Sequence, residues 1–314
     1  MLKQAFGVVS PAGRQARLSI LIFHRVLPKP DILFPDEIDA RRFDEICEWL
    51  KSWLNVLPLD KAVASLKNGT LPASPACITF DDGYADNHDV AVPVLKRHGL
   101  SATFFIATGF LDGGRMWNDS IIESVRLYGR SSLDLTELGL GCHASGTIAE
   151  KRAAITTLIG QIKYRPVEER ISITEKIAQL CEVRLPHDLM MTSNEVKAML
   201  QAGMQIGAHT VSHPILARAP DNEVREEIQT SKRSLEQLLG ERVGLFAYPN
   251  GKPGADYKPH HVDVVRSLGF DAAVSTAPGA SGGQDDLFQL RRFTPWDRTK
   301  LRFFVRMAAN LRRR

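Results

Sequence analysis

Short runs of consecutive apolar residues alternate along the chain with longer segments in which apolar residues recur every three or four positions. The short runs are typical of strands buried on both faces, and the longer spacing is typical of amphipathic helices. The expected strands are 19–23, 55–57, 77–80, 103–107, 205–208, 245–248, 272–275 and 289–292. The expected helices are 40–54, 60–67, 87–97, 192–201, 221–238 and 261–268.

This alternation predicts an α/β fold with a parallel sheet covered by helices. Because the strands number close to eight, a (β/α) barrel is favoured over an open sheet. The alternation breaks between about 110 and 191, where a polar stretch with Gly and Ser clusters precedes a helical part at 149–183. We expect one domain over 1–314, with an insertion at about 110–191 and a basic C-terminal helix at about 299–314.

Composition limits the class of protein. Hydrophobic residues make up 44% of the 314 positions and charged residues 24%, as in an ordinary globular protein. The net charge of +4 is too small to indicate a nucleic-acid partner. No run of eighteen apolar residues occurs, so no transmembrane segment is expected. The run 18–23 is too short for the core of a signal peptide, which predicts a cytoplasmic protein.

The basic tail leaves two interpretations open. Residues 299–314 place Arg302, Arg306 and Arg312 among apolar positions. Such a helix either packs on the barrel, which we favour, or lies on an anionic membrane surface as a peripheral contact.

The segment Thr79–Tyr84 (TFDDGY) carries the first candidate chemistry, because an apolar strand runs directly into Asp81, Asp82 and a glycine. Neighbouring residues of an extended chain point in opposite directions. One carboxylate can therefore bind a metal while the other faces a water molecule. Taken alone, the motif is equally compatible with a solvated turn.

The segment 209–213 (HTVSH) follows another expected strand. A spacing of four places His209 and His213 on one side of a helical turn, within reach of one metal ion. Two imidazoles and a carboxylate leave coordination positions free for water and substrate, as catalytic zinc requires.

A third strand ends in the segment 246–251 (FAYPNG). A Pro/Gly loop at this position either presents a backbone N–H to a developing oxyanion or is an ordinary turn.

Taken together and in this order, TFDDGY and HTVSH resemble the polysaccharide deacetylase family, the carbohydrate esterases with a NodB-type homology domain. The resemblance covers about 18–293, and the insertion fits less well. It implies a distorted (β/α) barrel of seven to eight strands. It also implies a divalent metal and removal of acetyl groups, mostly from N-acetylated sugars.

The resemblance also implies roles for individual residues. Asp82, His209 and His213 match the metal ligands, and Asp81 matches the general base. Asn250 stands where the family has a tyrosine whose backbone N–H helps to bind the oxyanion.

The sequence departs from the family in two places. Ala247 stands where an arginine often orients the base, and we expect Arg292, in preference to Arg291, to replace it. The late histidine that acts as general acid is absent. His24, at the end of the first strand, is the expected replacement, and its context resembles the exopolysaccharide-processing branch of the family.

These residues lead to one expected function and two alternatives. We expect a metal-dependent hydrolase that removes N-acetyl groups from a glycan or a lipid-linked sugar precursor. Zn²⁺ is the expected metal, although Co²⁺, Mn²⁺ and Ni²⁺ use the same ligands. The alternatives are a deformylase or another small-amide hydrolase with the same metal site, and a glycan-binding relative that has lost catalysis.

Overall fold

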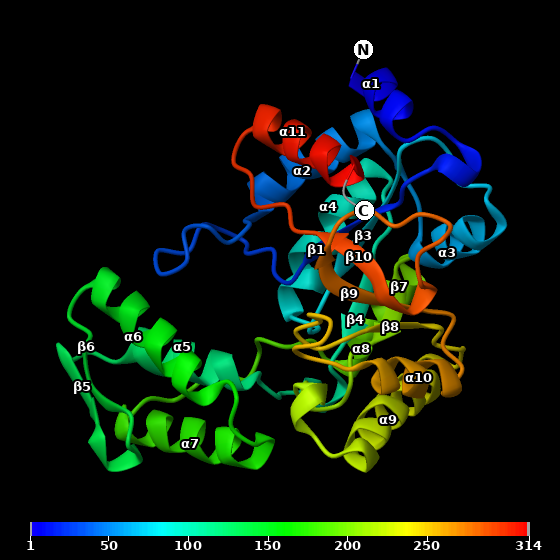
Figure 1. Ribbon diagram of the computed structural model, residues 1–314. Coiled ribbons are helices and arrows are strands. Elements are labelled where there is room, and N and C mark those ends of the chain that lie inside the picture. Colours follow the sequence, from blue (N-terminus) through cyan, green and yellow to red (C-terminus); the bar gives the residue numbers. More distant parts are fainter. Residues whose placement is uncertain (1, 313–314) are drawn as a thin grey trace.

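The computed structural model describes residues 2–312. Within them, a closed barrel of seven parallel strands confirms the predicted α/β architecture (Figure 1). β1 is hydrogen-bonded to both β10 and β3, which closes the ring, and β2 (Asn55–Val56) adds an eighth strand beside β3. In ring order the barrel strands are β1 (Ser19–Phe23), β10 (Leu290–Phe293), β9 (Ala272–Pro278), β8 (Leu245–Ala247), β7 (Gln205–Ala208), β4 (Thr103–Ile106) and β3 (Pro75–Phe80).

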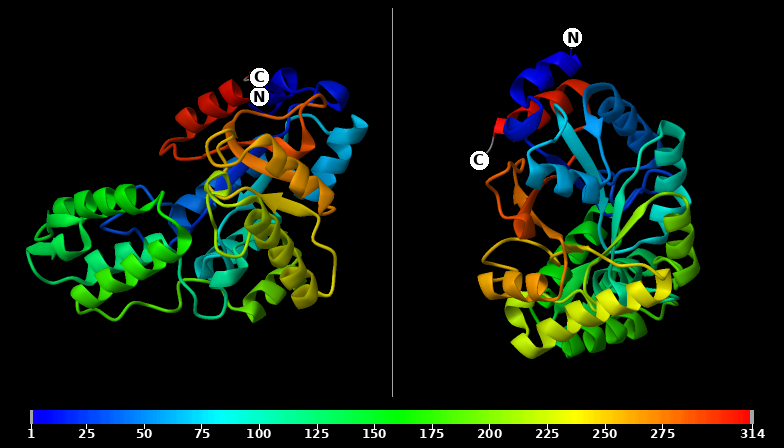
Figure 2. Two further views of the ribbon diagram at one scale, coloured as in Figure 1. Left: turned by 60° about the horizontal axis from the view of Figure 1, so that its bottom comes forward. Right: turned by 90° about the vertical axis from the view of Figure 1, so that its right-hand side faces the viewer.

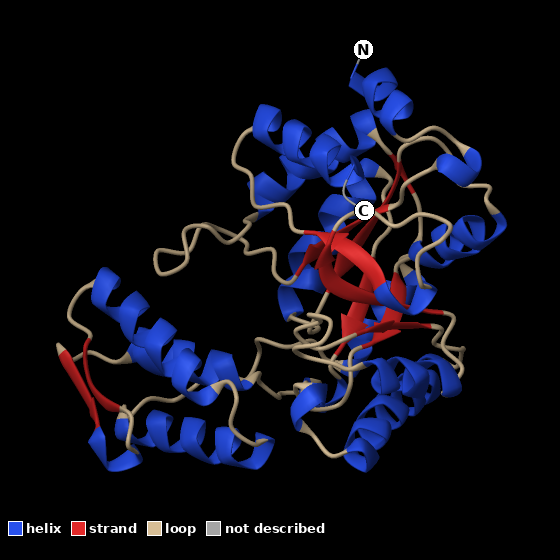
Figure 3. Cartoon of the chain, in the orientation of Figure 1, coloured by secondary structure: helices blue, strands red, loops and turns tan. Residues whose placement is uncertain are grey.

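Helices surround the barrel and alternate with its strands (Figure 3). The surrounding helices are α2 (Ala40–Trp53), α3 (Leu59–Asn68), α4 (Val92–His98), α8 (Ser193–Gln201), α9 (Asp221–Leu239) and α10 (Pro259–Ser267). The N-terminal α1 (Leu2–Val9) and the C-terminal α11 (Lys300–Arg312) lie side by side, and the rings of Phe6 and Phe304 meet there with centroids 4.8 Å apart. The expected helix at 87–97 begins with a π-helical turn at Asn87–Ala91.

Strand side chains alternate between two cores. Phe104 and Phe246 face the helices, whereas Phe105 and Leu245 belong to a second apolar cluster with the alternate residues of the other strands. Gly207 makes room for this second cluster, because a Cβ atom there would lie 2.4 Å from the ring of Phe105. Burial on both sides explains why these strands appear in the sequence as continuous apolar runs.

The insertion has a hydrophobic core of its own and stands to one side of the barrel (Figure 2). It consists of α5 (Trp117–Leu127), the antiparallel hairpin β5 (Ser132–Leu135) and β6 (Gly141–Ala144), α6 (Ile148–Ile162) and α7 (Val167–Leu180). The chain leaves and re-enters the barrel at adjacent points, since the Asp112 N–H donates to the Met191 carbonyl over 3.2 Å. Its assignment to one domain with the barrel stays a prediction.

The C-terminal helix packs on the barrel. Phe303, Met307 and Leu311 of α11 are buried in the main core, whereas Leu301 and Val305 are exposed. The sequence predicts that this helix extends to 314. Positions 313–314 lie outside the described residues. Across 2–312, none of the helices has both the length and the apolarity needed to span a bilayer.

Candidate active site

The three sequence motifs meet at the carboxyl ends of the barrel strands. Asp81 and Asp82 follow β3, His209 follows β7, and Asn250 lies in the loop after β8. In β/α barrels this end carries the variable loops and the active site. The closed parallel sheet therefore brings together side chains that are more than 120 positions apart in the sequence.

Asp82, His209 and His213 form a compact group of potential metal ligands. Their nearest ligand atoms all lie within 4.8 Å of one another. Oδ1 of Asp82 is 3.4 Å from Nε2 of His209 and 3.4 Å from Nε2 of His213. This oxygen is buried and accepts no hydrogen bond from any residue in the described range. An orphaned buried carboxylate oxygen facing two imidazole nitrogens fits a divalent cation.

A hydrogen bond to the barrel fixes the orientation of the His209 ring. Its Nδ1 lies 2.7 Å from the carbonyl oxygen of Ala247, so Nδ1–H donates and the lone pair of Nε2 points toward Asp82. Metal-binding histidines are commonly fixed in one tautomer by such a bond. Ala247, where the family often has an arginine, thus contributes through its backbone.

The expected helical turn between the two histidines is absent. Thr210 and His213 have left-handed backbone angles, with φ of 66° and 53°, and the segment is an irregular loop. Asp82 (φ 77°) and Asn250 (φ 56°) share this conformation. It is costly for residues with a Cβ and gathers at functional sites. The imidazoles converge because the loop folds back on itself.

Glu227 of α9 holds this loop from behind. Its carboxylate accepts hydrogen bonds from the backbone N–H groups of Val211 (2.8 Å) and Ser212 (2.9 Å) and from the Ser212 hydroxyl (2.6 Å). Three bonds to one carboxylate fix the backbone between the histidines. Sequence analysis missed this residue, because nothing in a helical glutamate indicates which loop lies beside it.

Asp81 is buried beside Asp82 and pairs with Arg292 of β10. The two guanidinium Nη atoms lie 2.7 and 2.8 Å from the two carboxylate oxygens of Asp81, and Nε donates to the Ser275 carbonyl over 2.8 Å. Arg292 is thus the arginine expected to replace the one missing at Ala247. The neighbouring Arg291 is half-buried and faces Asp285 at 3.9 Å.

These contacts set the charges of the site. Burial would raise the pKa of Asp81, but the guanidinium of Arg292 outweighs it and holds that pKa below its ordinary value. Burial would likewise raise the pKa of Asp82, but the imidazoles of His209 and His213 lower it. Burial lowers the pKa of His213 to about 4, so its imidazole is neutral at pH 7. The site therefore holds two carboxylates and a free imidazole ligand.

His24 and Asn250 lie at the same end of the barrel. His24 is exposed just after β1 and lines a cavity of about 460 Å³ together with Asp82. Asn250 is half-buried, and its carbonyl accepts a hydrogen bond from the Thr276 hydroxyl (2.8 Å), which fixes the turn.

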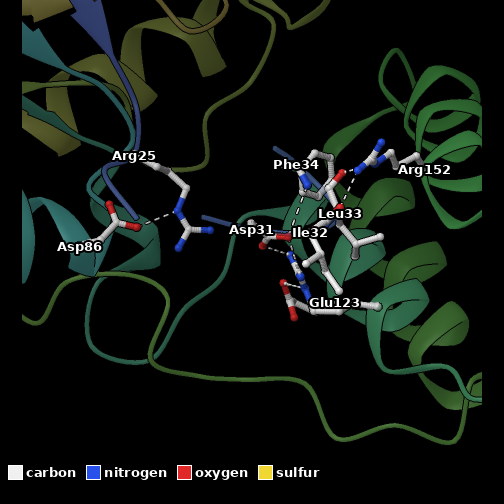
Figure 4. Close-up of polar contacts among 9 residues, drawn as sticks. Arg25, Asp31, Ile32, Leu33, Phe34, Asp86, Glu123 and Arg152 are labelled. Atoms are coloured by element: carbon white, nitrogen blue, oxygen red, sulfur yellow. Dashed lines mark hydrogen bonds and ion pairs between the residues drawn. The ribbon is translucent and has the colours of Figure 1, made fainter. Parts of the chain in front are cut away.

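The segment after β1, residues 24–39, crosses from the barrel to the insertion, and we call it the strap. On the barrel side, Nε of Arg25 lies 2.8 Å from Oδ2 of Asp86. On the insertion side, the carboxylate of Asp31 takes two hydrogen bonds from Arg126 of α5, at 2.7 and 3.1 Å (Figure 4). The strap thereby positions the insertion next to the cavity.

A second group of potential ligands lies on the surface, where Nε2 of His260 and of His261 are 3.0 and 3.6 Å from Asp221. Here the N–H of Lys258 donates to Nδ1 of His261. The ring proton is thereby placed on Nε2, which faces Asp221, so this nitrogen has no lone pair to offer a cation. The group fits a metal less well than Asp82, His209 and His213 do.

Known proteins resemble this chain in sequence and in fold. The chain is 20% identical over 281 residues to YxkH of Bacillus subtilis (strain 168), which carries the name of a polysaccharide deacetylase, covering 89% of this chain and 71% of that protein. The fold matches the deacetylase PplD of Streptococcus pyogenes in complex with acetate (TM-score 0.63, 20% identity, 93% of this chain and 98% of that chain). It also matches IcaB from Ammonifex degensii (TM-score 0.59, 19% identity, 97% and 99%).

The sequence profile described as "Polysaccharide deacetylase" matches residues 68–130 and 148–273, which together make up more than half of the chain. The match takes in all three motif loops and part of the insertion. The chain therefore belongs to the polysaccharide deacetylase family, hydrolases that cleave the carbon–nitrogen bond of amides.

Proposed function

We propose that this protein is a metal-dependent N-deacetylase that acts on an N-acetylated glycan or a lipid-linked sugar precursor, as in exopolysaccharide synthesis. The observation that carries the proposal is the convergence of Asp82, His209 and His213 beside the Asp81–Arg292 pair. Asp82, His209 and His213 would hold the cation, and Zn²⁺ suits this ligand set. Such an ion supplies Lewis acidity, which makes a water molecule more acidic and an acyl carbonyl more electrophilic.

The protein's own residues then handle protons and charge. Asp81, ionised at neutral pH and fixed by Arg292, accepts a proton from the attacking water. The backbone N–H of Asn250 donates to the oxygen that gains negative charge. The carbon–nitrogen bond breaks, His24 gives the departing nitrogen its proton, and the products are acetate and a free amine.

The first experiment measures acetate release from N-acetylglucosamine oligomers and lipid-linked N-acetyl sugars, with chelator and with restored Zn²⁺. We expect chelator to abolish acetate release and Zn²⁺ to restore it. Formylated donors assayed in parallel test the deformylase alternative. Stoichiometric metal without turnover on any acylated sugar would favour a glycan-binding protein.

Variants separate metal binding from chemistry. Asp82→Ala and His209→Ala are expected to lose metal and activity together, whereas Asp81→Asn keeps the metal and loses turnover. His260→Ala, in the surface group, is the control and keeps both. Wild-type turnover in Asp81→Asn would contradict the role of Asp81 as base, and metal loss confined to His260→Ala would move the metal to the surface.

Location and membrane contact stay predictions. Cell fractionation tests the expected cytoplasmic location. Binding to anionic vesicles, measured before and after Arg302 and Arg306 are neutralised, tests the peripheral contact through α11.

A further inference from the structure

The cavity beside Asp82 extends to the insertion. Its volume of about 460 Å³ lies within the range of small-molecule sites. His24 and Arg25 of the strap line one part, and Asn118 and Asp119 of α5 line another. A ligand that reaches Asp82 through this cavity therefore also meets the insertion.

Asp119 has an incompletely satisfied side chain. The residue is 3% exposed, and its Oδ2 is buried without a hydrogen-bond partner anywhere in residues 2–312. The Tyr84 hydroxyl neighbours this carboxyl and opposes the rise in its pKa. Arg25 is a nearby cation, but its guanidinium pairs with Asp86 and lies over the Tyr84 ring, 4.6 Å from the centroid. Burying half of a carboxyl without a partner costs stability, which folding alone does not explain.

Its surroundings allow the Asp119 carboxyl both to accept and to donate a hydrogen bond. Burial raises the pKa of Asp119 to about 7, against the opposing charge of Arg25. Near neutral pH the group therefore exists as an acceptor and, when protonated, also as a donor. A sugar hydroxyl likewise donates and accepts, so it complements the free oxygen in either state.

We infer that Asp119 is a substrate-binding residue, through which the insertion recognises a hydroxyl group of the sugar whose acyl group lies at Asp82. This inference rests on the proposed function, because it places the glycan in the same cavity. It assigns the insertion a share in substrate choice. The motifs that carry the family resemblance do not include Asp119, which lies in the first helix of the insertion.

The test compares Asp119→Ala, which removes both the acceptor and the donor, with the wild type in two assays. We expect KM for the N-acetylated oligosaccharide to rise about tenfold or more, with kcat changed less, because the lost contact is made on binding. Binding of the same oligosaccharide to metal-free protein, followed by NMR titration, should weaken to a similar extent. Bound metal should stay at the wild-type level, and a cooperative melting transition should show that the variant folds. Asp134→Ala, at an exposed aspartate in the hairpin of the insertion, is the matched control and changes neither assay.

Tyr84→Phe distinguishes substrate contact from a purely structural role. If Asp119 served only to hold Tyr84, both single variants and the double variant would show the same defect, and the inference would be overturned. Unchanged KM and unchanged NMR titration in Asp119→Ala would overturn it as well. Failure of the proposed function looks different, since the wild type would then release no acetate. Oligosaccharide binding that depends on Asp119 would still support the contact in that case.

Discussion

Asp81 and Arg292 are a fully buried ion pair whose partners lie 211 positions apart in the chain. A buried pair with two parallel hydrogen bonds fixes the direction of the carboxylate, which a general base requires. The pair also makes the site sensitive to the loss of either partner, because the remaining charge would be buried without its counter-charge.

Arg292→Met is expected to raise the pKa of Asp81, because burial then acts without the opposing guanidinium. The base stays protonated to higher pH, so the acid limb of the kcat/KM profile moves to higher pH. The free energy of unfolding at pH 7 should fall by about 3–5 kcal/mol, as for other broken buried pairs. A pH–rate profile measures the shift of the acid limb, and urea denaturation measures the free energy of unfolding. Arg292→Lys should restore part of the wild-type value of each.

In the wild type, the direction in which stability changes with pH follows from the lowered pKa of Asp81. Its ionised form is favoured in the folded state, so the pair stabilises the protein above the ordinary carboxyl pKa of 3.8. This stabilisation is lost as the pH falls below that value. Arg292→Met should lack this component of the acid sensitivity, and an unchanged pH–rate profile would contradict the pairing.

The sequence was sufficient to predict side chains that follow strands and insufficient for those that approach from helices. Asp82 and His209 end apolar runs, and a parallel barrel brings such ends together. Glu227 lies on the amphipathic helix α9, and its contacts depend on how that helix is rotated against the barrel. No local pattern encodes that rotation. Arg292 was within reach because the last strand was predicted and two adjacent arginines, Arg291 and Arg292, stand at its end.

The loop after β7 has an irregular backbone, and it has to bring the imidazoles of His209 and His213 close together. Thr210 and His213 are left-handed, and Glu227 of α9 supplies the bonds that hold the loop. The expected helical turn failed here because spacing alone cannot reveal a loop stabilised by a distant carboxylate. The hairpin β5–β6 was missed because its strands are short and largely exposed: β5 buries only alternate residues, and β6 buries none.

Glu227→Gln is expected to weaken metal affinity by about tenfold or more, because the amide replaces one of the acceptor oxygens that position the loop. The imidazoles themselves are untouched, so metal should still bind at higher concentration and restore turnover. Competition with a chromogenic chelator measures the affinity. Glu226→Gln removes an adjacent, exposed charge on the same helix and serves as the control. Equal affinities in the two variants would show that the loop holds its shape without Glu227.

At the scale of the molecule, the barrel supplies the potential metal ligands and the insertion supplies one wall of the cavity. The strap joins them, with Leu33 buried in the core of the insertion and its carbonyl accepting a hydrogen bond from Arg152 (Figure 4). The alternation of strands and helices predicted the barrel, and its interruption led us to expect an insertion at about 110–191. The docking of the insertion was beyond the sequence, because it depends on contacts between segments about 95 to 120 residues apart.

Arg126→Ala tests whether this docking matters for the substrate. Arg126 contributes two hydrogen bonds to Asp31 and one to Glu123, and the pair with Asp31 is only partly exposed. Without them, α5 is held to the strap mainly by apolar contacts, so Asp119 is less firmly positioned against the cavity. Faster amide hydrogen exchange in α5 and a higher KM should follow, with unchanged metal binding.

Arg130→Ala provides the comparison, because Arg130 also lies in the insertion but pairs with Glu182 on the exposed surface, away from the strap. Exposed pairs of this kind contribute little, so exchange in α5 and KM should match the wild type. If Arg126→Ala and Arg130→Ala behave alike, the insertion docks without its ion pairs. The strap would then act through the burial of Leu33, and Leu33→Ala would be expected to loosen α5 and raise KM.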